Sequence, residues 1–262
     1  MSVPASAISV ATTDPAGQGR PYKGAMTLTP TGDLGTVLGL WAHPDDEAYL
    51  SAGLMGALRD AGRRVVVATA TYGELGTPDP LRFPPDKLAA IRRDELHTSL
   101  TLVGVHEHHW LGYADGSCAD IPPADGADSV AKLISEIQPD TILTFGPEGM
   151  TGHPDHRTVS AWTRAAWLAT GARGRLLYAT LTPAFHDRWG ALNDRIGLWS
   201  YGNPPVTPDE DLAVRVTFTG AELDRKIAAL RSHASQVDGL VAEVGEETFH
   251  RWWSTEAFVP SN

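Results

Sequence analysis

Two short segments of this chain combine histidine, proline and aspartate in a pattern that could hold a catalytic metal ion. Residues 43–47 read His-Pro-Asp-Asp-Glu, and residues 153–156 read His-Pro-Asp-His. Each segment follows a short apolar run and precedes a stretch with helical periodicity, so each should lie between a strand and a helix. Two imidazoles and one carboxylate would supply three ligands and leave a fourth position for water, which is the arrangement of catalytic zinc.

The spacing within the first segment indicates how such a site would be built. Residues three apart at a helix start lie on one side of the turn, so His43 and Asp46 can converge on one point. His156 can reach that point from the second segment. Asp45 would lie beside the bound water and is the natural general base. Spacing alone leaves open which of the two aspartates binds the metal.

The second segment offers two further groups. His153 could stabilise a developing oxyanion or protonate a leaving group. Asp155 could hold that imidazole in its working tautomer. Both residues would act next to the metal rather than bind it.

Three alternatives compete with this hypothesis. Acidic residues in a first helical turn favour the helix dipole, so Asp45, Asp46 and Glu47 could be capping groups only. His43-x-Asp45 with a distant histidine also fits the triad of Fe(II) oxygenases, although that triad usually lies on an all-β scaffold. The third alternative is a non-catalytic sugar-binding protein of the same fold. Two His-Pro-Asp segments after two strands favour the catalytic site.

Other polar residues have more ordinary interpretations. Glu74 follows the second predicted strand and could meet substrate hydroxyls or be a loop acid. Arg92 is by default a solvated cation or a partner of a nearby glutamate, and Asp115 a turn residue before glycine. The cluster His106–His109 alternates across a strand and is interpreted as structural. Cys118 is interpreted as an inert thiol.

Strands and helices alternate along most of the chain. This predicts an α/β fold with an open, mostly parallel sheet, helices on both faces and a single domain. Residues 1–33 are expected to be an irregular lead-in and 34–262 the domain. Strands are expected at 36–41, 65–71, 108–113, 141–145, 175–180 and, at an edge, 212–218. Helices are expected at 47–59, 88–103, 130–137, 155–169 and, as the last one, 223–230, with 183–211 loop-like and an aromatic tail.

Composition limits the partners. The 262 residues include 32 acidic and 21 basic side chains, a net charge of −11, which argues against non-specific nucleic-acid binding. One cysteine excludes an internal disulfide. No apolar run approaches the roughly 20 residues of a membrane span, and the first residues do not resemble a secretory signal. We therefore expect a cytoplasmic protein without a membrane span, with homo-oligomer formation left open.

Four motifs together resemble a known family. They are Trp41-Ala-His-Pro-Asp-Asp-Glu47, the Thr-x-Gly-Glu-x-Gly string at 71–76, Arg92-x-x-Glu95-Leu96 and Gly152-His-Pro-Asp-His156. In order and spacing they resemble the PIG-L/LmbE-like deacetylases over roughly residues 35 to 235. The resemblance implies a Rossmann-like fold and a zinc-dependent amidohydrolase that removes acyl groups, usually acetyl, from N-acetylglucosamine-type substrates.

The resemblance also implies roles for particular residues. By matching position, His43, Asp46 and His156 would bind one Zn²⁺ per chain, and Asp45 would be the base. His153, oriented by Asp155, would stabilise the transition state. The residues that would contact the sugar or its substituent are Glu74, Arg92 and Asp115.

One position departs from the pattern of the mycothiol-pathway members of this family. Those deacetylases carry a tyrosine two places before the first histidine of the second motif. Here that position is Thr151, so a phenol donor to the oxyanion is absent or comes from elsewhere.

Overall fold

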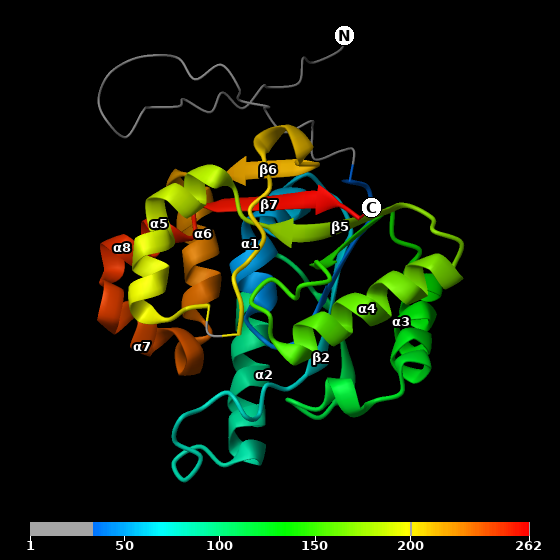
Figure 1. Ribbon diagram of the computed structural model, residues 1–262, viewed down its shortest axis with the longest axis horizontal. Coiled ribbons are helices and arrows are strands. Elements are labelled where there is room, and N and C mark those ends of the chain that lie inside the picture. Colours follow the sequence, from blue (N-terminus) through cyan, green and yellow to red (C-terminus); the bar gives the residue numbers. More distant parts are fainter. Residues whose placement is uncertain (1–33, 200, 262) are drawn as a thin grey trace.

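The computed structural model describes residues 34–199 and 201–261, and the expected irregular segment 1–33 lies outside them. The described chain forms one seven-stranded sheet with helices on both faces (Figure 1). This confirms the predicted α/β class and the single domain. Across the sheet the strands are β3 (Glu107–Tyr113), β2 (Val65–Thr71), β1 (Val37–Trp41), β4 (Thr141–Phe145), β5 (Arg175–Thr180), β7 (Thr255–Pro260) and β6 (Val214–Thr217).

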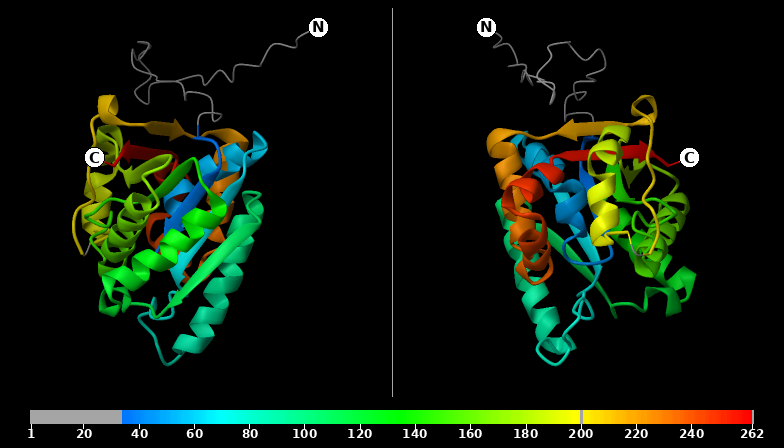
Figure 2. Two further views of the ribbon diagram at one scale, coloured as in Figure 1. Left: turned by 90° about the vertical axis from the view of Figure 1, so that its right-hand side faces the viewer. Right: turned by 60° about the vertical axis from the view of Figure 1, so that its left-hand side comes forward.

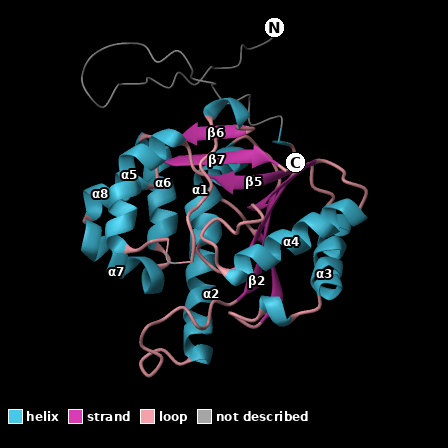
Figure 3. Ribbon diagram, in the orientation of Figure 1, coloured by secondary structure: helices cyan, strands magenta, loops and turns pink. Residues whose placement is uncertain are grey.

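The helices form two layers around this sheet. Helices α3 and α4 pack together on one face, whereas α1, α2 and α6 pack together on the other. Figures 2 and 3 show the same layers from further sides and by element type. The helices are α1 (Asp46–Asp60), α2 (Pro85–Leu102), α3 (Pro123–Ile137), α4 (Pro154–Ala169), α5 (Pro183–Ile196), α6 (Gly220–Arg231), α7 (Ala234–Val244) and α8 (Glu246–Trp252), with short 3-10 turns at Cys118–Asp120 and Asp209–Asp211. No helix in this part of the chain is both long and apolar enough to cross a membrane.

The two strands that precede the His-Pro-Asp segments are neighbours. The chain runs outward from β1 to β2 and β3 and then returns to β4 on the other side of β1. Strands β1 and β4 are parallel, with Val37 opposite Thr141 and Gly39 opposite Leu143. The strand order therefore reverses between them, and the crevice outside the carboxyl ends at such a switch point is where open α/β sheets bind ligands.

Burial explains the apolar runs from which these strands were predicted. Every residue of β1 and β4 is buried, because helices cover both faces of the sheet. The ring of Trp41 meets that of Phe145 edge-on at a centroid distance of 5.1 Å, just before the two loops begin. Both loops therefore begin at strand ends that are packed in the core.

The prediction that residues 183–211 are loop-like is wrong for their first half, which forms α5. Pro183 does not prevent this helix because it is the first helical residue, where a missing N–H breaks no internal bond. The Thr182 hydroxyl accepts a hydrogen bond from the Phe185 amide at 3.1 Å and caps the helix. Gly197, at φ 64°, ends it before the remaining prolines.

The prediction that α6 is the last helix is also wrong. Helix α7 follows after only two residues, and α8 and β7 come after it. Strand β7 inserts antiparallel between β5 and the edge strand β6. Trp252 and Phe258, which the sequence presents only as an aromatic tail, are fully buried in the core. Strand β7 is defined by its pairing with β5 and β6, and its own residues show no pattern that predicts a strand.

A buried ion pair ties this C-terminal region to α1. Lys226 Nζ and Glu256 Oε1 are 2.7 Å apart, and both side chains are fully buried. The two oxygens of Glu256 accept from the amides of Gly53 and Leu54, each at 2.8 Å, in the middle of α1. Such a pair is tolerated because its partners satisfy it completely, and it fixes α1 relative to the last strand.

Candidate metal centre

The first loop turns sharply between β1 and α1. Helix α1 begins at Asp46, and its N-cap residue Asp45 has φ 111° and ψ −28°. Pro44 therefore lies outside the helix, before the N-cap residue. The amide of His43 donates to Asp46 Oδ2 at 2.8 Å, which folds the loop back on the helix start. A positive φ is uncommon for a residue with a side chain and, where it occurs, is often found at functional sites.

The second loop enters its helix in the regular way. Pro154 is the first residue of α4, where a missing N–H breaks no internal bond, and His153 is the N-cap. The His153 Nδ1 atom accepts from the Asp155 amide at 3.2 Å. One helical turn in, His156 packs its ring against Phe145 at a centroid distance of 4.1 Å and an interplanar angle of 9°. This stacking holds the imidazole toward the first loop.

Three side chains from the two loops come close enough to share a cation. His43 Nδ1 lies 3.1 Å from His156 Nε2. The carboxylate of Asp46 lies 3.3 Å from His156 Nε2 through Oδ1 and 3.7 Å from His43 Nδ1 through Oδ2. Ligand atoms bound to one tetrahedral zinc ion at the usual bond lengths are about 3.4 Å apart. The two imidazole nitrogens have a spacing close to this value, and Asp46 approaches each ring through a different oxygen, so the donor types fit such an ion. Metal binding by these residues stays a prediction.

The far nitrogen of each imidazole has its own partners. His43 Nε2 faces Asp115 Oδ1 at 3.1 Å and Asp155 Oδ2 at 3.2 Å. His156 Nδ1 faces the Gly149 carbonyl at 3.0 Å. Partners of this kind fix the tautomer and orientation of metal-binding histidines, so that Nδ1 of His43 and Nε2 of His156 are the free ligand atoms.

The charges around the two rings differ. Burial alone would lower the pKa of His43, but its hydrogen bonds to Asp115 and Asp155 and the charge of Asp46 raise it to about 10. Burial, together with the charge of His43, lowers the pKa of His156 well below its ordinary value. A divalent cation at His43 Nδ1 would replace one proton of this acid-surrounded ring.

Two other groups of potential ligands are present. The ligand atoms of His43, His153 and His156 lie within 4.8 Å of one another, as do those of His43, Asp115 and Asp155. In the second group each oxygen of Asp155 already accepts from a backbone amide, because Gly116 donates to Oδ2 at 2.8 Å and Cys118 to Oδ1 at 3.1 Å. That carboxylate is therefore better suited to support His43 than to bind a cation.

The carboxylate of Asp155 was expected to orient His153, but it has other partners. Its carboxylate faces His43 and not His153, because the first turn of α4 directs it into the interior. It is the backbone amide of Asp155 that contacts His153. Burial and the charge of His43 lower the pKa of His153. In its neutral form the ring then keeps its proton on Nε2, because Nδ1 accepts from that amide.

The carboxylate of Asp45 contacts α2. Its Oδ2 lies 3.3 Å from Arg92 Nη2. The guanidinium also donates to the carbonyls of Pro44 and, at 2.9 Å, Gly73. Burial raises the pKa of Asp45 to about 6, while the charge of Arg92 opposes this shift. A partly buried carboxylate of that pKa, beside a cation site, is suited to accept a proton near neutral pH.

The three residues expected to contact a sugar make well-defined protein contacts. Arg92 is buried and is neither a solvated cation nor a partner of Glu95, whose carboxylate binds Ser235. Glu74 Oε1 accepts from the Asp115 amide at 2.9 Å, and Asp115 Oδ2 accepts from the Leu75 amide at 2.8 Å. Sugar binding by Glu74, Arg92 and Asp115 stays a prediction.

The pKa of the Asp115 carboxyl is also strongly shifted. Burial alone would raise its pKa, but the hydrogen bond and charge of His43 lower it to about 2. The carboxylate is therefore ionised at neutral pH. Its Oδ1 contacts His43 and its Oδ2 the Leu75 amide, so a substrate would have to share it with these groups.

Two residues at the site carry no signal in the sequence. The ring of Tyr201 meets that of His153 edge-on at 4.9 Å and is 64% exposed. Its loop is brought there by a close backbone contact, because a Cβ at Gly152 would lie 2.5 Å from the Tyr201 carbonyl oxygen. His233 reaches the first loop from the junction of α6 and α7. Neither residue lies in a recognisable motif.

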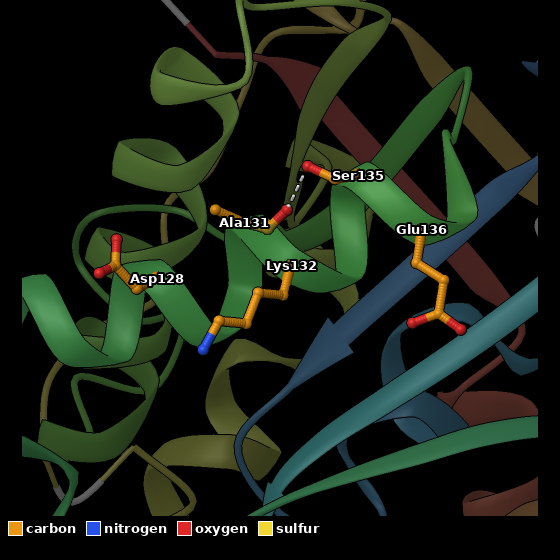
Figure 4. Close-up of a pocket in the computed structure, with 5 residues that line it drawn as sticks. All are labelled: Asp128, Ala131, Lys132, Ser135 and Glu136. Carbon is orange, nitrogen blue, oxygen red and sulfur yellow. Dashed lines mark hydrogen bonds between the residues drawn. The ribbon is translucent and has the colours of Figure 1, made fainter.

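A hollow on α3 lies apart from these groups. It is lined by Asp128, Ala131, Lys132, Ser135 and Glu136 (Figure 4). The Ser135 hydroxyl donates to the Ala131 carbonyl at 2.8 Å, which is a local helix contact. The hollow brings together no group of potential metal ligands or catalytic residues, so the candidate site is the one at the switch point.

The sheet, its switch point and the histidine–aspartate cluster define an α/β protein with a candidate metal centre. A sequence model of the PIG-L family, described as GlcNAc-PI de-N-acetylase, matches residues 38–167. A 1D-myo-inositol 2-acetamido-2-deoxy-alpha-D-glucopyranoside deacetylase of Kineococcus radiotolerans is 32% identical over 77% of this chain and 68% of its own length. The enzyme of the same name from Acidothermus cellulolyticus is 32% identical over 79% and 84%. This chain belongs to the PIG-L family.

Solved structures agree on the fold. The N,N'-diacetylchitobiose deacetylase from Pyrococcus horikoshii, in complex with an inhibitor, superimposes with a TM-score of 0.59 and 25% identity, covering 89% of this chain and 86% of that protein. The superposition extends well beyond the family match at 38–167. The C-terminal helices and strands are therefore part of the shared architecture.

Proposed function

We propose that this protein hydrolyses the N-acetyl amide of an N-acetylglucosamine conjugate and releases acetate and a free amine. The proposal assigns the activity to residues 34–262 and the metal, zinc, to His43, Asp46 and His156. It is supported by family membership, by the 32% identical relatives named as deacetylases of a glucosamine–inositol conjugate, and by the spacing of the three ligand atoms.

A bound zinc ion would supply an acidified water and a Lewis acid at the open coordination position. The chain supplies the remaining groups. The oxygen of the water attacks the amide carbonyl carbon, and Asp45 accepts the proton that the water gives up. Arg92, at 3.3 Å, favours the ionised form of Asp45 that this step requires. His153 is positioned by the Asp155 amide to donate from Nε2 to the carbonyl oxygen as it becomes negative.

The second half of the reaction breaks the bond between carbon and nitrogen. The departing nitrogen takes one proton and becomes the free amine, while the acyl carbon keeps the oxygen of the water as acetate. The acid available at the site for this transfer is the protonated form of Asp45, which carries the proton taken from the water, while neutral His153 keeps its Nε2 proton toward the carbonyl oxygen.

A single observation carries the proposal. The two oxygens of Asp46 lie toward the imidazoles of His43 and His156, whereas Asp45 is turned toward Arg92 on a strained backbone. The two neighbouring aspartates are thus separated into a ligand and a base. This arrangement favours the hydrolase over the Fe(II) triad, which would need Asp45 as the ligand.

The test is hydrolysis by protein with defined metal content. Protein stripped with a chelator and reloaded with Zn²⁺ or Fe²⁺ is incubated with N-acetylglucosaminyl-inositol and with N,N'-diacetylchitobiose. We expect one acetate for each new primary amine, loss of both after chelation, and recovery on adding the metal. No amine from either substrate with the loaded protein, or unchanged turnover after complete removal of metal, would refute the proposal.

A further inference from the structure

A buried carboxylate lies directly behind the strained turn. Glu47, the second residue of α1, is fully buried. Its Oε2 accepts from the backbone amide of Asp45 at 3.0 Å. Its Oε1 lies 3.0 Å from Nε2 of His233 and 3.4 Å from the Ser99 hydroxyl. Glu47 is therefore shared between the turn, α2 and the junction of α6 and α7.

The turn needs such support. Asp45 has a φ of 111°, and a residue with a side chain keeps such a backbone only when its surroundings determine it several times over. Two contacts act on opposite sides of this residue. Glu47 holds its amide, and Arg92 holds its carboxylate and the preceding carbonyl of Pro44.

His233 supplies a buried hydrogen-bond donor to this carboxylate, because its Nε2 faces Glu47 Oε1. It is fully buried, and it lies 186 residues from Glu47 along the chain. A buried carboxylate that loses such a donor carries a large desolvation cost. The other close contact on Oε1 is the Ser99 hydroxyl, a neutral donor at the longer distance. His233 lies beyond residues 38–167, where the family model matches.

We propose that Glu47 and His233 are positioning residues for the hydrolytic reaction: together they hold the Asp45 amide so that the Asp45 carboxylate faces the attacking water. The inference depends on the proposed function for its kinetic consequence only. His233, at the junction of α6 and α7, would thus support the Asp45 turn through Glu47 without contacting the substrate.

The kinetic test compares variants that keep or remove each contact. In Glu47→Gln an amide oxygen can still accept from the Asp45 amide, and in His233→Gln a side-chain N–H can still donate to Glu47. Glu47→Ala and His233→Ala remove these contacts. We expect the alanine variants to lose about 100-fold in kcat with unchanged KM and metal content, and the glutamine variants to recover most of it.

A matched control is available nearby. His250, in α8, pairs with Asp224 at 2.8 Å and is partly exposed. His250→Ala should leave kcat and KM unchanged. A kcat within twofold of wild type in folded, metal-loaded His233→Ala would overturn the proposal, as would a loss in kcat that merely follows lost metal. If the alanine variants do not fold, the glutamine variants and the measurement below decide.

A second measurement does not depend on activity. Hydrogen exchange of the Asp45 amide is followed in metal-free protein. The amide should be protected in wild type, exchange a few-fold faster in Glu47→Gln, whose neutral oxygen is a weaker acceptor, and exchange at least tenfold faster in Glu47→Ala, while amides in the middle of β1 keep their rates. Equal Asp45 rates in all three would refute the positioning role, even in an active enzyme. Absence of hydrolysis with the expected exchange pattern would refute only the proposed reaction.

Discussion

The two His-Pro-Asp segments share three letters but not a geometry. In the first, the proline lies outside the helix and Asp45 is a strained N-cap whose carboxylate faces α2. In the second, Pro154 begins the helix, and Asp155 has ordinary helical backbone and a carboxylate fully buried against His43. The same aspartate position is a partly accessible base candidate in one loop and an interior support in the other.

The difference arises from where each helix begins and from what surrounds it. Helix α1 starts at Asp46, directly after Asp45, whereas α4 starts at Pro154. The first aspartate is held by Glu47 and Arg92, and the second by the amides of Gly116 and Cys118. A local motif therefore supplies the functional groups, while distant partners assign the task of each group.

The largest expected effect distinguishes His43 from His153, which are the first histidines of the two segments. His43→Ala removes a ligand atom facing Asp46 and His156, so metal content should fall and turnover drop below about one-thousandth of wild type. His153→Ala should keep the metal, because its Nδ1 is bound to a backbone amide. Metal analysis and acetate release measure both. Equal loss of metal in the two variants would break the comparison.

The next effect separates the two aspartates. Asp45→Asn should lower kcat by about 1,000-fold at unchanged metal content, because an amide cannot accept the proton of the water. The product of a single turnover, measured against time, reports the chemical step directly. Near-wild-type turnover of this variant on a hydrolysed substrate would show that Asp45 is not the base.

The matching change in the second segment should act on the metal. Asp155→Asn weakens the support of His43 Nε2, and outer partners of this kind typically contribute about 10–100-fold in metal affinity. Competition with a chelator of known affinity measures the change. A loss in kcat without any change in affinity would instead return Asp155 to the role of orienting His153.

Backbone strain predicts stability effects of opposite sign. At position 45 glycine should be more stable than alanine by about 1 kcal/mol, because glycine adopts positive φ without strain. At position 155 alanine should be more stable than glycine by about 0.5 kcal/mol, since the residue is helical. Denaturant unfolding of the four variants gives both differences. The same order at both positions would contradict the strain argument.

The smallest effect concerns pH and the support behind the first segment. Burial alone would lower the pKa of His233, but Glu47 raises it above its ordinary value. The stability gained is complete below about pH 6.5 and is lost as the pH rises through the folded-state pKa. The difference in free energy of unfolding between wild type and His233→Gln should therefore shrink from about pH 6 to pH 9. A difference that grows with pH would exclude this ion pair.

Most of the sheet could be predicted, because buried parallel strands leave continuous apolar runs. The expected strands at 141–145 and 175–180 have the observed bounds. The C-terminal region could not be predicted in the same way. Helix α5 starts at a proline, and β7 is a strand because it pairs with β5 and β6. Contacts between distant segments decide such elements, and local patterns do not record them.

The candidate site divides in the same manner. Residue types and spacing were sufficient to select both loops and their histidines and aspartates, because the carboxyl ends of parallel strands lie at one edge of the sheet, where such folds bind ligands. They did not reveal that Asp155 supports His43, that Arg92 binds Asp45, or that His233 lies behind the turn. Those assignments depend on backbone dihedrals and on partners far apart in the chain.

The sequence by itself determined the chemistry that this protein can perform, because side-chain identity sets which atoms can bind a cation or take a proton. Only the tertiary structure decided which atom does which. Asp45 and Asp46 are identical side chains one residue apart, and the φ of 111° at the first one sends their carboxylates in different directions. That angle is maintained by Glu47 and Arg92, whose positions follow from the packing of α1, α2 and the junction of α6 and α7.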